Sequence, residues 1–327
     1  MERVIVTGGA GYIGSHVCKA LASRNMEPVT VDDLRNGYAD AVRWGPLEQA
    51  SVLDSEGLAA IIRRYRPSAV LHLAGLIVAG ESVHRPLDYY ADNVGGTLAV
   101  LQAMKATDVS VLVFSSTASI YGIPTSIPVA EGAALTPINP YGASKAMSER
   151  ILADCADHGG PRAVSLRYFN ACGADGDGHV GERHRPETHL IPLVIRAALD
   201  PDYVLTVHGT DYDTPDGTGI RDYVHVSDIA AAHVLALDYL RAGGIGQALN
   251  LGTGSGYSVR QVIAEVERQT GRAVKLQTAP RRPGDTPVLV ADASRAISVL
   301  GWAPHRSDLA TIVASACAWH TRVGWTE

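Results

Sequence analysis

The chain has 327 residues, of which 46% are apolar and 19% charged, as in a globular protein large enough to bury a substantial core. Its 28 Lys and Arg against 34 Asp and Glu give a net charge of −6, which excludes nucleic-acid binding through a broadly basic surface. No apolar run approaches the ~18 residues that span a bilayer, and the four cysteines form no CxxC pair, so we expect a cytoplasmic protein with free thiols.

Short runs rich in Val, Ile and Leu alternate with segments of helical periodicity in the first half of the chain. Because these runs do not alternate apolar with polar residues, they are typical of strands buried on both faces of a parallel sheet. The predicted strands are Val4–Thr7, Pro28–Val31, Ala69–Leu73, Ser110–Ser115 and Ala163–Arg167, and the predicted helices are Tyr12–Ser23, Ser55–Arg64, Leu87–Ala106 and Pro140–Asp157. This order predicts an α/β fold, a doubly wound parallel sheet of the Rossmann type.

The composition changes after Asn170, where Gly, Pro, Asp and His become frequent. We predict a Rossmann domain over residues 1–170, to which part of 227–250 returns, and a smaller α/β lobe over residues 171–327. The expected elements of this second half are helices at Val226–Arg241, Ser258–Thr270 and Ala291–Leu300 and strands near Val204–Val207, Ala248–Leu251 and Val274–Thr278.

A glycine-rich motif, Gly8-Gly9-Ala10-Gly11-Tyr12-Ile13-Gly14, joins the first predicted strand to the first predicted helix. Glycines at this spacing permit a tight turn and close approach of the backbone to a pyrophosphate, which the helix N-terminus attracts. Asp32 ends the next predicted strand, 18 residues after Gly14. A carboxylate there accepts both hydroxyls of a ribose and repels a 2′-phosphate, so the motif predicts binding of NAD rather than NADP.

Tyr141 and Lys145 lie four residues apart in a segment that Pro140 favours as the first turn of a helix. This spacing places both side chains on one helix face. A free phenol has a pKa near ~10, and we expect the lysine ammonium to lower that value so that Tyr141 acts as a base. Thr117, just past a predicted strand, could hydrogen-bond the same substrate oxygen.

These motifs and several others together resemble the extended short-chain dehydrogenase/reductases, most closely their UDP-galactose 4-epimerases, over nearly the whole chain. The further segments that carry the resemblance are Leu71–Gly75, Gly80–Val83, Leu166–Asn170, Asp216–Val226 and Arg281–Asp285. The resemblance implies a UDP-sugar 4-epimerase with tightly bound NAD. In such an enzyme C4 of UDP-glucose or UDP-galactose is oxidised to a transient ketone and reduced again on its other face.

The resemblance also implies roles for individual residues. The implied catalytic residues are Tyr141, Lys145 and Thr117. The implied cofactor-binding residues are Gly8, Gly11, Tyr12, Ile13, Gly14, Asp32, Asn36, Ser51, Val52, Leu73, Ala74, Gly75, Asn93, Ser115, Tyr141, Lys145 and Tyr168. The implied substrate-binding residues are Thr117, Asn170, Leu190, Val207, His208, Arg221, Arg282, Asp285 and Leu289.

Three positions depart from the family pattern. Ser51 stands where an Asp often meets the adenine, Ile77 where some relatives have a lysine, and His208 where an aromatic residue meets the uracil. Leu289 aligns with the residue that gates the sugar pocket. Because leucine is smaller than the tyrosine that excludes a 2-acetamido group, UDP-N-acetylhexosamines stay open as substrates, as do UDP-pentoses.

Two other classes of protein remain as alternatives. A 4,6-dehydratase needs an Asp-Glu pair after the threonine, but Ala118 and Ser119 follow Thr117. A non-catalytic NAD sensor would not require the Tyr141–Lys145 pair.

The histidine-rich segment around residues 179–189 raises the question of a metal. His179, Glu182, His184 and His189 fit no standard ligand spacing, so we expect no metal and a charged flap over UDP. His72, His225 and His233 are expected to be structural. The resemblance further implies a homodimer formed through Leu87–Ala106 and Pro140–Asp157.

Overall fold

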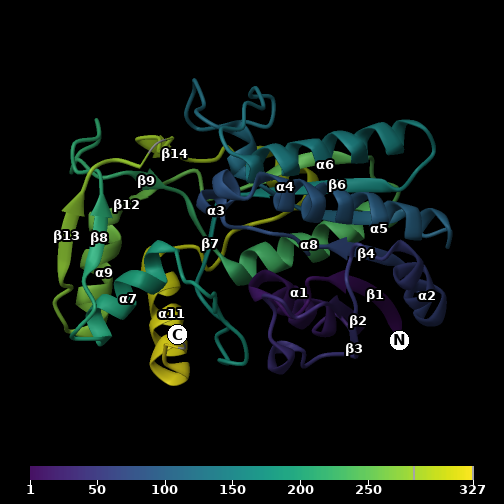
Figure 1. Cartoon of the computed structure of the whole chain (residues 1–327), viewed down its shortest axis with the longest axis horizontal. Coiled ribbons are helices and arrows are strands. Elements are labelled where there is room, and N and C mark those ends of the chain that lie inside the picture. Colours follow the sequence, from purple (N-terminus) through teal and green to yellow (C-terminus); the bar gives the residue numbers. More distant parts are fainter. Residues whose placement is uncertain (283, 326–327) are drawn as a thin grey trace.

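The computed structural model describes residues 1–282 and 284–325, and its largest element is a seven-stranded sheet with helices on both faces (Figure 1). The strands lie in the order β3-β2-β1-β4-β5-β6-β11, and every neighbouring pair is parallel. Their bounds are β1 Glu2–Thr7, β2 Met26–Asp32, β3 Leu47–Gln49, β4 Ala69–His72, β5 Val111–Thr117, β6 Arg162–Tyr168 and β11 Gln247–Leu251. The predicted doubly wound α/β fold is confirmed.

Both faces of the sheet are buried, which explains why its strands are apolar without alternation. In β1, Val4 and Val6 pack into the core under α1 (Tyr12–Ala22) and α8 (Val226–Arg241), whereas Ile5 points into the opposite core. That second core is covered by α2 (Ser55–Tyr65), α5 (Gly95–Lys105) and α6 (Pro140–Asp157).

The predicted helix Leu87–Ala106 is interrupted. The short helix α4 (Pro86–Tyr89), which follows α3 (Ala79–His84), leads through a π-helical turn at Tyr90–Val94 into α5. The turn contains Asn93, whose side chain bonds the backbone of Leu76 in both directions. A π-turn re-aims one side chain within a helix, and it does so here beside the predicted site.

The second half of the chain supplies the remaining elements, which lie mostly at the left of Figure 1. They are α7 Leu190–Leu199, α9 Val259–Thr270, α10 Ser294–Leu300, α11 Leu309–Val323, and the strands β7 Asn170–Cys172, β8 Leu205–His208, β9 Ile220–Arg221, β10 Tyr223–His225, β12 Tyr257–Ser258, β13 Leu276–Ala279 and β14 Val288–Leu289. Helices α7, α9 and α11 share one apolar core. Neither α7 nor α11 was expected from the sequence, and the division into domains stays a prediction.

No disulfide links the four cysteines. Within residues 1–282 and 284–325, every helix is too short or too polar to cross a bilayer.

Replacing Gly14 by alanine should destabilise the fold measurably. A Cβ at Gly14 would lie 2.0 Å from the carbonyl oxygen of Gly8, so the turn between β1 and α1 would have to move. We expect the free energy of unfolding to fall by about 1–3 kcal/mol or more. Urea unfolding measures this, with Gly132→Ala as the control, because a Cβ at Gly132 meets no atom within 4 Å. Equal midpoints for the two variants would contradict the close approach.

Candidate active site

The carboxyl ends of the parallel strands bring most of the predicted site residues to one edge of the sheet. Thr7 at the end of β1 hydrogen-bonds His72 at the end of β4 over 2.7 Å. At the ends of β5 and β6, Thr117 pairs in register with Tyr168, and the hydroxyl of Ser115 contacts that of Tyr168. This edge is where ligands bind in open α/β sheets.

The glycine loop is shaped to approach a ligand closely. Gly8 has φ +72°, and a Cβ there would lie 2.6 Å from the backbone nitrogen of Ala74, so the loop after β1 packs directly on the loop after β4. Helix α1 begins after Gly11 with no side-chain cap. The first backbone N–H groups of α1 therefore face outward, as a pyrophosphate requires.

The aromatic side chain that follows this loop has another partner. The hydroxyl of Tyr12 donates to the carbonyl oxygen of Gly173 over 2.6 Å. Of Tyr12, the main chain rather than the phenol is thus available to a phosphate. Ile13 packs partly buried against the α1–α8 core.

Asp32 is held in place for a ribose. Its two carboxylate oxygens accept the N–H groups of Leu34 at 2.9 Å and Ala10 at 3.1 Å, and the residue is 8% exposed. Burial raises the pKa of Asp32, and the two hydrogen bonds oppose that shift. Because each oxygen has a second lone pair, the carboxylate can still accept from sugar hydroxyls.

The predicted adenine-side residues lie on the neighbouring loops. Asn36 is exposed beyond β2, and Val52 is buried after β3. Ser51 accepts the N–H of Leu53 at 3.2 Å through its hydroxyl. Their contacts with a cofactor stay predictions.

Tyr141 and Lys145 lie in the first turns of α6, as predicted. Helix α6 begins at Pro140, and the side chain of Asn139 caps it by accepting the N–H of Gly142 at 2.8 Å. Tyr141 is 8% exposed and Lys145 is 4% exposed. The ammonium of Lys145 donates to the carbonyl oxygen of Ser115 over 3.0 Å, which ties this helix to the end of β5.

The expected acidification of Tyr141 is wrong for the chain alone. Burial raises the pKa of Tyr141, and the hydroxyl of Thr117 only partly opposes this shift. Burial also lowers the pKa of Lys145, to about 8, against the opposing charge of Glu149. For both side chains, the loss of contact with water shifts the pKa more than their proximity on one helix face does. A phenolate at neutral pH therefore needs a further positive charge in the site.

A buried ion pair under the catalytic helix was not foreseen. Glu149 on α6 binds Arg167 on β6 at 2.6 Å, and both side chains are less than 9% exposed. Ser116 donates a hydrogen bond to the same carboxylate. One signal was present in the sequence: Glu149 follows Tyr141 and Lys145 at the same four-residue interval, so all three share a helix face.

Asn93 braces the site. Besides its bonds to Leu76, its amide donates to the hydroxyl of Ser144 over 2.9 Å, and Ser144 donates to the carbonyl of Tyr141. Its oxygen would lie 2.6 Å from a Cβ at Gly75. Asn93 thus fixes the loop after β4 against α6.

Four predicted substrate residues come together in the second half of the chain. Asp285 lies 3.5 Å from Arg221 and 3.2 Å from Arg282. Leu289 on β14 pairs in register with Arg221 on β9 and packs against a small core that contains Phe169. The cationic side chains of Arg221 and Arg282 and the apolar Leu289 therefore lie near one another. Pro283, within the same motif, lies outside the described residues.

The other predicted substrate residues lie on separate elements. The N–H of Asn170 donates to the carbonyl of Asp222 over 2.9 Å, and Leu190 is the first residue of α7. Val207 and His208 end β8, where His208 pairs in register with Ala279. Among the described residues, no hydrogen bond joins these four to Tyr141.

Three histidines that we expected to be structural are buried and hydrogen-bonded. His225 caps α8 through Nδ1, and His233 contacts the carbonyl of Ile229 at 2.9 Å. Burial lowers the pKa of His225 and of His233 to about 4, and that of His72 to about 3. Neutral, bonded imidazoles at these positions are consistent with a role in packing.

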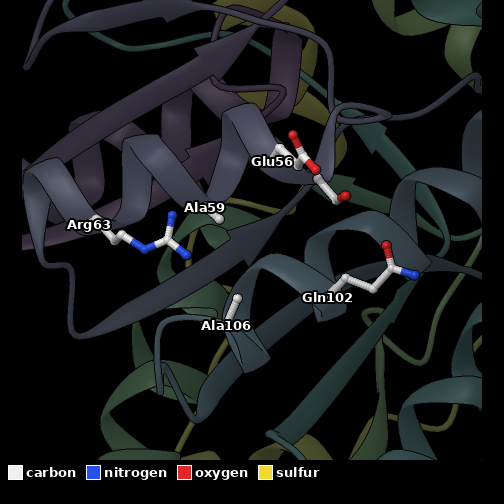
Figure 2. A pocket seen from close by; sticks show the side chains of 6 residues that line it. Glu56, Ala59, Arg63, Gln102 and Ala106 are labelled. Atoms are coloured by element: carbon white, nitrogen blue, oxygen red, sulfur yellow. The ribbon is translucent and has the colours of Figure 1, made fainter.

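A solvent-facing hollow of about 550 Å³ lies elsewhere, between α2 and α5 (Figure 2). It is lined by Ser55, Glu56, Ala59, Arg63, Gln102 and Ala106. None of these is a predicted site residue.

Comparisons with known proteins agree with the geometry at the edge of the sheet. The model of the NAD dependent epimerase/dehydratase family matches residues 4–252. The UDP-glucose 4-epimerase of Rhizobium meliloti (strain 1021) is 49% identical over 98% of each chain. The solved structure of the Brucella ovis UDP-glucose 4-epimerase in complex with NAD is 48% identical, with a TM-score of 0.95 over 97% of this chain and 98% of that one.

A further solved structure contains a sugar nucleotide. It is a UDP-glucose-4-epimerase from Stenotrophomonas maltophila with bound NAD and formylated UDP-arabinopyranose, 41% identical, with a TM-score of 0.95 over 98% of each chain. Since the family model covers most of the chain and the relatives extend over nearly all of it, the chain belongs to the NAD dependent epimerase/dehydratase family.

Proposed function

We propose that the chain is a UDP-sugar 4-epimerase that interconverts UDP-glucose and UDP-galactose with bound NAD. The observation that carries this proposal is the buried Tyr141–Lys145 pair beside Thr117, at the sheet edge that also holds the glycine loop. Relatives at up to 49% identity over the full chain have the same activity in their names. Two observations argue against the alternatives. The acidic pair of a dehydratase is absent after Thr117, and a non-catalytic sensor would not need a buried Tyr–Lys pair.

The residues present fit NAD. The uncapped start of α1 and the glycines of its loop suit a pyrophosphate, and the Asp32 carboxylate suits an adenosine ribose. When bound, NAD supplies the acceptor and donor of hydride for C4 of the sugar. Its positive nicotinamide would also provide the charge that Tyr141 lacks in the chain alone.

Tyr141 transfers the proton, and Thr117 orients the oxygen that carries it. The Tyr141 phenolate accepts the proton of the C4 hydroxyl, and the same phenol returns it after the carbon has been reduced on its other face. Thr117 orients the sugar oxygen through a hydrogen bond. Lys145 keeps its ammonium buried beneath the site and stabilises the phenolate form.

Binding must hold the nucleotide firmly while the sugar turns. Arg221 and Arg282 supply charge-assisted hydrogen bonds to the pyrophosphate, each of about 1.5–3 kcal/mol. Asp285, which lies between the two arginines, accepts from the uridine ribose. The sugar itself meets the apolar Leu289, which offers no hydrogen bond and so permits rotation.

The side chain at position 289 bears on the choice of sugar. Leu289 leaves room for an N-acetylhexosamine, and one similar protein was solved with a UDP-pentose derivative. We place UDP-glucose and UDP-galactose first. Steady-state kinetics on the glucose, N-acetylglucosamine and xylose pairs tests the order. A higher kcat/KM for N-acetylglucosamine would overturn the preference, and no interconversion of any pair would overturn the activity.

Replacing Asp32 by asparagine should weaken NAD binding. The amide keeps the size of the side chain but lacks the charge that holds the ribose hydroxyls, so we expect about a 10–150-fold loss of affinity. NAD content after purification and titration of the stripped protein measure it. Asp33→Asn is the matched control, because Asp33 pairs with Arg35 at the surface. Equal affinities in the two variants would contradict the role of Asp32.

We also propose a homodimer through α5 and α6, which lie together in Figure 1. Leu98 on α5 and Met147 on α6 are 43% and 48% exposed, and Leu87 is 81% exposed. Exposed apolar side chains on adjacent helices favour helix-to-helix packing with a second copy. Light scattering that gives the mass of one chain would reject the dimer.

A further inference from the structure

A second cluster of ionisable side chains lies in the segment that leads into α7. Glu182, His184, Glu187 and His189 each offer one donor atom, and these four atoms lie within 4.8 Å of one another. The Glu182 side chain is 4% exposed, that of Glu187 is 10% and that of His184 is 16%. The proposed reaction uses none of these side chains.

This arrangement differs from the charged flap expected from the sequence. The spacing of His179, Glu182, His184 and His189 along the chain fits no standard metal frame, yet the fold gathers the last three of them with Glu187 and buries the two carboxylates. His179 does not join them, and lies instead 3.5 Å from Asp175. Lys19 forms an ion pair with Asp175, so the carboxylate beside His179 already has a cation.

Two of the four contacts within the cluster have the separation expected between ligands of a tetrahedral ion, and Glu187 offers a different oxygen to each histidine. Nδ1 of His184 lies 3.3 Å from Glu182 Oε1 and 3.4 Å from Glu187 Oε2, and Nδ1 of His189 lies 2.9 Å from Oε1 of each glutamate. Ligands bound at ~2.0–2.2 Å in a tetrahedron are separated by about 3.3–3.6 Å. Two contacts fit this range, and two need to widen by a few tenths of an ångström.

Hydrogen bonding accounts for only one of these contacts, that between His189 Nδ1 and Glu187 Oε1 at 2.9 Å. Within the described part of the chain, Glu182 Oε1 and His184 Nδ1 are buried and have no hydrogen-bond partner, although nitrogen and oxygen atoms face each other at close range. Because buried polar atoms are normally hydrogen-bonded, these two atoms require another partner. Two buried carboxylates also require a positive charge.

We propose that Glu182, His184, Glu187 and His189 bind one divalent metal ion of the Zn²⁺ type. Two carboxylates and two neutral imidazoles carry a charge of −2, which the ion balances. Because four protein side chains complete a tetrahedron, the site is structural and leaves no position for a substrate.

The position of the cluster indicates what such an ion would stabilise. The ring of His184 contacts the edge of the Tyr12 ring, with centroids 6.0 Å apart, and Tyr12 opens helix α1. His189 directly precedes α7, whose first residue is the predicted substrate-binding residue Leu190. The ion would therefore link the first turn of the cofactor helix to the start of a substrate-side helix.

The competing state contains no metal and two protonated histidines. The glutamates would then overcome the effect of burial and raise the pKa of His184 to about 9 and that of His189 to about 10. Metal binding requires these nitrogens deprotonated, so the two states respond oppositely to chelators and to added metal.

Metal analysis of the full-length, untagged protein with its NAD retained separates the two states. We expect about one equivalent of zinc per chain, a lower melting temperature after EDTA, recovery with Zn²⁺, and visible absorption bands of tetrahedral cobalt after Co²⁺ exchange. Glu182→Gln should lose the metal, whereas His179→Gln, in the same segment, should keep it. Zinc well below stoichiometry, with a melting temperature unaffected by EDTA, Zn²⁺ or Co²⁺, would overturn the proposal. If Glu182→Gln does not fold, the zinc content and melting temperature of the wild-type protein still test the proposal.

Discussion

Tyr141→Phe should lower kcat by about 10²–10⁴-fold while NAD stays bound. The substitution removes only the phenolic oxygen, which is the group that moves the proton of the C4 hydroxyl in our account. The ring of Tyr141 is 8% exposed and packs against that of Tyr89, so phenylalanine fills the same space. A coupled assay for UDP-galactose conversion measures kcat, and the NAD released on denaturation gives the occupancy.

The matched control for this variant is Tyr239→Phe. Tyr239 lies on α8, and its hydroxyl bonds the side chain of Gln247, away from the sheet edge that carries the site. We expect that variant to retain wild-type turnover. Near wild-type turnover in Tyr141→Phe would show that another group takes the proton.

Glu149→Gln should have the largest effect on stability. It leaves Arg167 as a buried, unpaired cation, and breaking a buried ion pair in this way costs about 3–5 kcal/mol. Glu149 and Arg167 connect α6 to β6, so their separation should also loosen the helix that presents Tyr141 and Lys145. Guanidinium unfolding measures the loss, and kcat reports the displacement of the catalytic helix.

An exposed ion pair on the same helix provides the control. Arg150 and Asp154 are 79% and 55% exposed, and Asp154→Asn should change stability by less than about 0.5–1 kcal/mol. Combining Glu149→Gln with Arg167→Met removes the orphaned charge, so the double variant should lose less than the sum of the single losses. Additive losses would mean that the two side chains are not coupled.

Local motifs explain why much of the site could be predicted. The glycine loop, Asp32 and the Tyr141–Lys145 pair are each defined by spacing within one or two adjacent elements, and strand ends of a parallel sheet meet at one edge. Helix α6 begins at the predicted residue because Asn139 and Pro140 provide its start signal.

Features that depend on distant contacts were missed. Glu149 meets Arg167 only after α6 packs on the sheet, and the pKa of Tyr141 depends on how completely that packing excludes water. The cluster at Glu182 and His189 likewise forms only when a loop folds back on itself, because the segment that carries its members is neither helix nor strand. Pairwise spacing along the chain has no information about such burial.

Incubation with UDP-glucose in D₂O, followed by proton NMR of the sugar, tests the central claim most directly. If C4 gives up its hydrogen as hydride and receives it back within one closed site, UDP-galactose accumulates with protium retained at C4. Deuterium at C4 of the product would show that solvent protons reach this carbon, and no galactose product at all would show that the chain does not epimerise this sugar.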